Sequence, residues 1–235
     1  HWKGDFYPEN VPKSRWFDYY LTKFNSVEIN ATFYRTFKDQ TYEKWRERVS
    51  PSFLYVLKTP RLITHRKHLL DVENDIKEFS RSASILEDRL GLILLQLAPQ
   101  TVFDLERLRG AILAFGDPAR VAVEFRNEKW LKEETFNLLK ELGAVYCDVD
   151  SPNLRPTGLV TSSSGYIRLH GPNRWYSSNY SDEELADTAR LAVEMHTRGA
   201  KRVFIYFNND VGGYAPRNAL QLMQYLGKSV FPESG

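Results

Sequence analysis

Charged side chains recur at the ends of apolar, strand-like runs of this sequence. Glu28 lies in SVEINATFYR and Glu124 in RVAVEFRN. Two carboxylates in different surroundings divide the roles of general acid and general base, and His170, in YIRLHG, titrates near neutral pH and suits proton transfer. Lys58, in FLYVLKTP, is a nucleophilic amine if burial beside arginines lowers its pKa, although an ion-pair partner is the commoner role. These residue types indicate acid–base or nucleophilic chemistry, and we assign catalytic roles to them and to Asp148.

Cationic and amide side chains accompany these groups. Arg126 and Arg168 present forked donors that suit bidentate capture of a phosphate or carboxylate. Gln96 and Asn208 close two further runs, and Tyr214 lies in the segment NNDVGGYAP that follows the last run. We assign these five residues to binding of a polar, anionic substrate.

A metal site is the less favoured alternative. Glu28, Glu124, Asp148 and His170 make an acceptable set of oxygen and nitrogen ligands for a divalent ion. Three cationic side chains among the same strand ends disfavour a dense cation site, because like charges repel. We therefore assign no metal ligand and leave the cofactor unknown. His65 and His68, in LITHRKHLL, are interpreted as part of a solvated loop, with a position bordering the rim as the less favoured alternative.

Seven short apolar runs, rich in Val, Ile, Tyr and Phe, alternate with amphipathic helical patterns. The runs begin at Ser26, Phe53, Leu90, Arg120, Ala144, Tyr166 and Lys201. The helical patterns cover residues 14–24, 40–49, 72–86, 103–115, 131–143, 181–199 and 216–226. Gly143 is the expected C-terminal cap of one helix, and Ser181 with Glu184 form the capping box of another. The stretch 151–165 has no helical period and is predicted to be a long loop.

Strict alternation of strands and helices predicts parallel strands joined by helical crossovers. We expect an α/β fold of the (β/α) TIM-barrel type, as a single domain over residues 1–235, with seven strands here and the first strand missing upstream. An open doubly wound sheet is the competing fold. It is disfavoured because the sequence lacks both the G-x-G-x-x-G and the P-loop patterns.

The alternation of side chains along each run indicates where the polar groups lie. Successive strand residues point to opposite faces, so Val121, Val123 and Phe125 share one face while Glu124 and Arg126 share the other. Helices cover the outer face of a parallel barrel, so the polar face is the interior, which opens at the C-terminal rim. We expect one cavity there to collect Glu28, Lys58, Gln96, Glu124, Arg126, Asp148, Arg168, His170 and Asn208. The alternative is a structural ion-pair network that plugs the barrel.

The runs also resemble a known family. Stretches spread over nearly the whole chain are similar to the YecE-like family, known as domain of unknown function 72. These stretches are GDFYP, VEINATFYR, LKTPRLITH, LLQLAP, AVEFRNEKW, YIRLHG and FIYFNND with GYAP. The resemblance implies a (β/α) barrel. It implies no settled reaction.

Bulk properties narrow the classes of function. The formal net charge is only +2, which gives no basic signal for nucleic acid. No apolar stretch is long enough to span a membrane, so no membrane partner is expected. The single cysteine, Cys147, lies in the apolar run VYCDV, is expected to be buried, and fits a reducing cytoplasm.

These observations favour an uncharacterised barrel enzyme that acts on a small phosphorylated or carboxylated compound at the rim. The alternatives are a nucleic-acid repair or nuclease-type enzyme, for which the loop aromatics would hold a displaced base, and a binding module without turnover. The reaction and the oligomeric state are not assigned.

Overall fold

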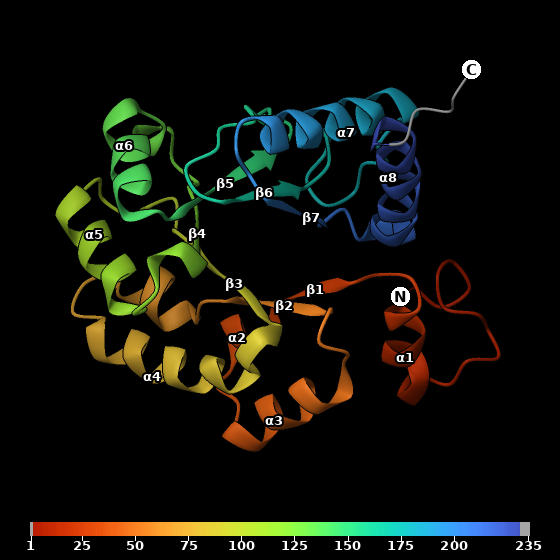
Figure 1. The fold of residues 1–235 in the computed structure, drawn as a ribbon, viewed down its shortest axis with the longest axis horizontal. Helices are drawn as coiled ribbons and strands as arrows, with labels where there is room; N and C mark the ends of the chain where they lie inside the picture. Colours follow the sequence, from red (N-terminus) through yellow and green to blue (C-terminus); the bar gives the residue numbers. More distant parts are fainter. Residues whose placement is uncertain (1, 231–235) are drawn as a thin grey trace. The chain divides into compact units, whose positions relative to one another are not determined.

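The computed structural model describes residues 2–230 and shows an α/β fold of the TIM-barrel type, as the alternation of strands and helices predicts (Figure 1). Its strands follow one another in chain order in a seven-stranded sheet, and the pairings from β1 to β5 and of β6 with β7 are parallel. The strands are β1 (Ser26–Ile29), β2 (Leu54–Lys58), β3 (Leu90–Gln96), β4 (Val121–Glu124), β5 (Val145–Asp150), β6 (Ser164–Leu169) and β7 (Arg202–Phe207).

Helices occupy the crossovers between successive strands, except between β5 and β6. The α-helices are α1 (Trp16–Leu21), α2 (Ala31–Tyr34), α3 (Asp39–Arg48), α4 (Glu73–Ala83), α5 (Leu105–Ala114), α6 (Glu133–Leu142), α7 (Asp182–Thr197) and α8 (Tyr214–Val230). Shorter helical turns are η1 (Lys13–Arg15), η2 (Leu62–Arg66), η3 (Ser84–Arg89), η4 (Pro118–Arg120), η5 (Glu128–Trp130) and η6 (Val211–Gly213). The described chain from 151 to 163 contains no helix, which confirms the predicted long loop.

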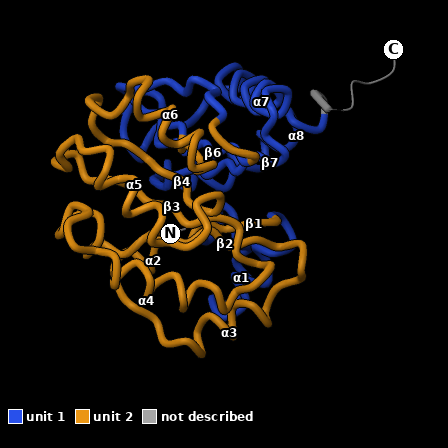
Figure 2. Tube along the Cα trace, turned by 60° about the vertical axis from the view of Figure 1, so that its left-hand side comes forward, with its two compact units in different colours: residues 1–24, 148–160, 164–235 blue, residues 25–147, 161–163 orange. Residues whose placement is uncertain are grey.

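The chain divides into two compact units, which Figure 2 shows in different colours. Residues 25–147 with 161–163 form one, called here the β1–β4 unit. Residues 1–24, 148–160 and 164–235 form the other, called the β6–β7 unit. The single domain over residues 1–235 stays a prediction, and each unit is described by itself below.

The β1–β4 unit is built on strands buried on both faces. All four residues of β4 are buried, as are six of the seven residues of β3, because helices such as α4 and α5 cover one face. Leu94 and Leu95 are completely buried, and Ile76 of α4 and Ile112 of α5 are completely buried as well. The register sets Gln96 opposite Glu124 and so aligns the polar C-terminal ends of β3 and β4.

The β6–β7 unit packs α7 and α8 against its own strands. Ile167 and Leu169 of β6 share one buried cluster with Leu185 and Met195 of α7 and with Leu222 of α8. Alternate residues of β6 face this cluster, so Arg168, between two of them, points to the other face. The apolar faces of α7 and α8 cover one face of β6, so the polar side chains of the strand lie on its other face.

Local signals for helix ends are confirmed. Ser181 caps α7 and forms a capping box with Glu184, in which each side chain bonds to the backbone of the other residue. Gly143 ends α6 with φ 69°, a left-handed conformation that costs a residue with a Cβ atom more than it costs glycine.

Two expectations are corrected. The run that begins at Ser26 is a strand only to Ile29, and the residues ATFY that follow form α2. Alternating polarity cannot reveal this change, because four residues fit a strand and one helical turn equally well. His65 does not lie in a solvated loop: it belongs to η2, a π-helical turn whose Ile63 and Thr64 are buried. Cys147 is buried, as expected.

Candidate functional site

The carboxylate of Glu124 lies at the centre of a buried polar group in the β1–β4 unit. Its side chain is 0% exposed at the end of β4. Gln96, opposite Glu124 in the register, donates from Nε2 to Glu124 Oε1 at 3.1 Å. Arg126, just beyond the strand and 12% exposed, forms an ion pair with the same oxygen. In a medium of low dielectric these charge-assisted contacts hold the carboxylate in one orientation.

Phe33 brings a second pair of polar groups together in the same unit. The ammonium nitrogen of Lys58, the last residue of β2, lies 4.5 Å from the centroid of the Phe33 ring. The imidazole of His65 meets that ring edge-on, with 4.9 Å between centroids and an interplanar angle of 86°. The aromatic ring therefore limits the positions that both nitrogenous side chains adopt.

Burial and cationic neighbours both act on the imidazole of His65. Burial is the largest cause that lowers its pKa, followed by the charges of Lys58, Arg61, His68 and Arg126. Each of these neighbours is cationic or becomes so on protonation. An anion bound near His65 would be attracted by the same charges and would reverse their effect on the imidazole.

Five of the predicted site residues belong to the β1–β4 unit: Glu28, Lys58, Gln96, Glu124 and Arg126. Direct contacts join the last three, and Lys58 and Arg126 both act on His65. Glu28 is half-buried in β1 and lies opposite Val56 in the register, so it is set back from the end of β2.

Arg168 organises the polar residues of the β6–β7 unit. Its side chain is almost completely buried in β6, and its Nη1 lies 3.4 Å from Nε2 of His170. Its Nη2 donates to Oδ1 of Asn208 at 3.2 Å. A guanidinium only donates, so Nε2 of His170 is the acceptor and the imidazole is neutral in this arrangement. Nδ2 of Asn208 is buried and has no hydrogen-bond partner among residues 2–230, which leaves a donor for a ligand.

Two aromatic rings flank His170. The ring of Trp175 lies 5.4 Å from the imidazole and that of Tyr176 lies 5.5 Å from it, between centroids. Tyr176 has φ 62°, a conformation that is strained for an aromatic residue, and it is 46% exposed. Its backbone N–H donates to the carbonyl of His170 at 2.6 Å, which holds the strained turn against the end of β6.

Asp148 holds the long loop that follows β5. Its Oδ2 accepts from the backbone N–H groups of Thr157 and Gly158, both at 2.7 Å, and from the Thr157 hydroxyl at 3.2 Å. Burial raises the pKa of the carboxyl to about 6, although these hydrogen bonds act in the opposite direction. Gly158 has φ 68°, and a Cβ atom there would lie 2.7 Å from Cδ1 of Leu191. These contacts give Asp148 a structural role in the loop alongside its predicted catalytic role.

Tyr214, predicted to bind substrate, begins α8, and its ring lies 5.9 Å from the guanidinium carbon of Arg217. The remaining predicted residues of the β6–β7 unit are Asp148, Arg168, His170 and Asn208. Within the unit, hydrogen bonds join the last three. The convergence of all the predicted residues in one cavity stays a prediction.

Sequence reasoning missed Phe33, Arg61 and the partial burial of His65. No apolar period marks η2, whose buried residues Ile63 and Thr64 are adjacent in the sequence. A π-helical turn shows neither of the usual periods, so the sequence pattern predicts a loop there. Among residues 2–230, no group of three or more His, Cys, Asp or Glu side chains is placed to hold a metal ion. No helix in the described part of the chain is long and apolar enough to cross a membrane.

The parallel strands, their helical crossovers and the polar residues at the C-terminal strand ends define a TIM-type α/β barrel protein. The chain belongs to the family described as "Protein of unknown function DUF72", whose model matches residues 1–234. This match confirms the resemblance to the YecE-like family. The chain is 26% identical over 256 residues to the UPF0759 protein YunF of Bacillus subtilis (strain 168), covering 94% of this chain and 89% of that protein.

Solved structures of the family have the same fold. A DUF72 family protein from Thermotoga maritima (TM1631) matches with a TM-score of 0.86 and 30% identity, over 96% of this chain and 94% of that one. A DUF72 family protein from Enterococcus faecalis (EF0366) matches with a TM-score of 0.80 and 24% identity, over 89% and 87% of the two chains. The second likeness shows the fold alone.

Proposed function

We propose that this protein is an enzyme that acts on a small anionic compound, phosphorylated or carboxylated, at the C-terminal ends of the strands. The observation that carries the proposal is that three cationic side chains act together on the imidazole of His65: Lys58, Arg61 and Arg126. Cationic side chains brought together beside aromatic and amide groups are typical of a site for an anion.

The residues of the β1–β4 unit suggest separate roles. Lys58 and Arg126 bind the anionic group of the substrate, and Gln96 donates a hydrogen bond that orients Glu124. Glu124, completely buried at the strand end, accepts or returns a proton during the reaction. His65, whose pKa is lowered, is neutral at pH 7 and is available as a second proton acceptor.

The β6–β7 unit has a similar grouping, for which we propose similar roles. Arg168 suits capture of a carboxylate or phosphate, and Asn208 offers the buried Nδ2 donor that lacks a protein partner among the described residues. His170 is neutral beside Arg168 and suits proton transfer. The single cysteine of the sequence fits a reducing compartment, so we place the activity in the cytoplasm.

The test uses inorganic phosphate as the probe and the Hε1 proton of His65 as the reporter. Phosphate should bind saturably and raise the pKa of His65, because a negative charge favours the imidazolium form. Lys58→Met and Arg126→Gln should each weaken binding roughly tenfold or more. Lys44→Met, an exposed lysine on α3, is the matched control and should change nothing.

Turnover is then followed by NMR with a mixture of sugar phosphates and hydroxy acids, and Glu124→Gln should abolish any conversion found. Failure of phosphate to perturb His65, or equal affinity in Lys58→Met and wild type, overturns the anion site. Binding without conversion of any compound supports the binding module instead. Saturable binding of a DNA duplex in place of phosphate supports the nuclease-type alternative.

A further inference from the structure

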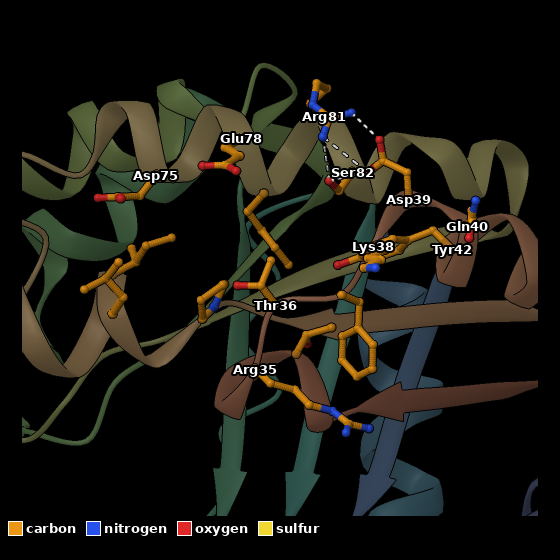
Figure 3. A pocket seen from close by; sticks show the side chains of 16 residues that line it. Arg35, Thr36, Lys38, Asp39, Gln40, Tyr42, Asp75, Glu78, Arg81 and Ser82 are labelled. Atoms are coloured by element: carbon orange, nitrogen blue, oxygen red, sulfur yellow. Dashed lines mark hydrogen bonds and ion pairs between the residues drawn. The ribbon is translucent and has the colours of Figure 1, made fainter.

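A cavity of about 560 Å³ lies within the β1–β4 unit (Figure 3), and Glu124 is not among the residues that line it. Its three main walls are the segment from Arg35 to Gln40, the segment from Pro60 to Ile63, and α4, and Thr32 and Tyr42 complete the lining. This volume lies in the range of pockets that bind small molecules. Neither the strand-end chemistry nor the family match assigns a role to this cavity.

One part of the lining is apolar. Phe37, Leu62, Ile63 and Phe79 contribute hydrophobic side chains from all three walls. Leu62 is 40% exposed even though it begins the η2 turn. An apolar body bound here would remove this surface from water, at about 25 cal/mol for each Å² buried.

Two of the acidic side chains in the lining are already neutralised by the protein. Asp39 receives two hydrogen bonds from Arg81, at 2.8 and 3.2 Å, and one from the Ser82 hydroxyl at 2.9 Å (Figure 3). The Arg81 contact and the Ser82 hydroxyl lower the pKa of Asp39, which keeps it ionised. Asp75 pairs with Lys67 at 2.6 Å. These ion pairs hold the side chains of the lining in place, and each pair has no net charge.

Three charged side chains of the lining form no ion pair among residues 2–230: Glu78, Arg35 and Lys38. Glu78 projects from α4, whereas Arg35 and Lys38 come from the connecting segment on the other wall (Figure 3). The guanidinium of Arg35 lies 4.6 Å from the centroid of the Phe37 ring, which places a cation beside the apolar surface. The cavity thus offers an acid from one wall and bases from another, with hydrophobic side chains in its lining.

We propose that this cavity is a binding site for a small zwitterionic molecule with an apolar body, of the size of an unblocked dipeptide. Its ammonium group pairs with Glu78, its carboxylate pairs with Lys38 and Arg35, and its apolar part packs on Phe37 and Leu62. A purely anionic ligand would leave Glu78 beside a like charge, and a purely cationic ligand would oppose Arg35 and Lys38. A neutral ligand would desolvate all three charges without a partner.

The η2 turn contributes residues both to this cavity and to the polar group at the strand ends. Leu62 and Ile63 line the cavity, while His65 of the same turn is not part of its lining and contacts Phe33. The proposal does not rest on the anion site. Its test uses a different probe, so the two fail or succeed separately.

Calorimetric titration with unblocked Phe-Leu, Leu-Phe and Val-Tyr dipeptides tests the proposal on the whole chain. At least one should bind saturably, and its N-acetylated and C-amidated forms should bind roughly tenfold more weakly or not at all. Glu78→Gln, Lys38→Gln and Leu62→Ser should each lower affinity. Glu73→Gln and Lys77→Gln, which remove exposed charges from the same helix α4 outside the lining, should leave affinity unchanged.

Either of two results overturns the proposal. One is that no unblocked dipeptide binds the wild type. The other is that affinity stays at the wild-type, unblocked value when a terminus is blocked or when both Glu78→Gln and Lys38→Gln are introduced. The substituted residues are exposed, so loss of folding does not confuse the comparison, and a melting curve of each variant verifies this.

Discussion

Gln96 and Glu124 stand opposite each other at the ends of β3 and β4, and the amide of Gln96 donates to the Glu124 carboxylate at 3.1 Å. Parallel pairing aligns the two residues, and burial of both strand faces removes them from water. A carboxylate that is 0% exposed is costly unless it is paired or used. This relationship makes Glu124 the most informative residue to change.

Replacing Glu124 with glutamine should keep the melting temperature unchanged or raise it, while it removes anion turnover. The reason is that the side chain of Arg126 is 12% exposed and keeps part of its hydration. Loss of the Glu124 charge therefore does not leave Arg126 as a fully buried, unpaired cation. Differential scanning calorimetry and the turnover assay make the two measurements. Glu141→Gln, at an exposed pair with Arg109, is the control. A loss of roughly 3–5 kcal/mol, as for a broken buried ion pair, would show instead that Glu124 is structural.

Lys58→Met should raise the pKa of His65. After burial, the charge of the Lys58 ammonium is the largest cause that lowers the pKa of His65. Methionine at position 58 keeps the packing on Phe33 and removes the charge. NMR titration of the His65 Hε1 proton measures the change directly. Lys44→Met should leave the titration where it is in wild type. An unchanged pKa in Lys58→Met would mean that the ammonium of Lys58 does not act on His65.

Asp148→Asn should change the dependence of stability on pH. The folded pKa of Asp148 is raised to about 6, so the folded state holds a proton that the unfolded state releases near pH 4. This group therefore stabilises the fold fully below pH 4, and its contribution is lost as pH rises from about 4 to about 6. The asparagine variant, whose Oδ1 still accepts from Thr157 and Gly158, should lack this decline.

Denaturant unfolding at a series of pH values measures this effect. At pH 7 the Asp148→Asn variant should be more stable than wild type, by an amount on the order of 2 kcal/mol. Asp88→Asn, at an exposed position in η3, supplies the control and should follow the wild-type curve. Lower stability of Asp148→Asn at pH 7 would contradict the assignment and indicate that the ionised carboxylate holds the loop.

Gly158→Ala should destabilise the protein by roughly 1–3 kcal/mol. The residue has φ 68°, and its new Cβ atom would lie 2.7 Å from Leu191 Cδ1 and 2.8 Å from Nη1 of Arg198. Gly110→Ala is the matched comparison, because Gly110 is inside α5 and has open space around it. There alanine should stabilise by about 1 kcal/mol through its higher helix propensity. Melting curves of the two variants should therefore shift in opposite directions, and a shared direction would refute the conformational argument.

Local sequence patterns determined the order of strands and helices in this protein and the ends of several of these elements. The alternation of apolar runs with helical periods predicts the parallel strands, because burial on both faces demands continuous apolar residues. Polar residues at the ends of those runs mark the strand ends, and Ser181, Glu184 and Gly143 mark helix ends through bonds made within a few residues. Each of these features depends on local backbone geometry, which sequence patterns report well.

Contacts between residues that are far apart in the sequence are known only from the tertiary structure. The hydroxyl of Thr32, in the ATFY stretch that forms α2, lies within hydrogen-bond distance of the carbonyl oxygens of Ile29 and of Lys58, 26 residues away, at 3.0 and 2.6 Å. His65 contacts Phe33 from within η2, a π-helical turn, and this geometry has no recognisable sequence period. The charge pair of Arg81 and Asp39 in the cavity wall joins residues 42 apart. Such contacts follow from packing in three dimensions, and the spacing of residues along the chain does not encode them.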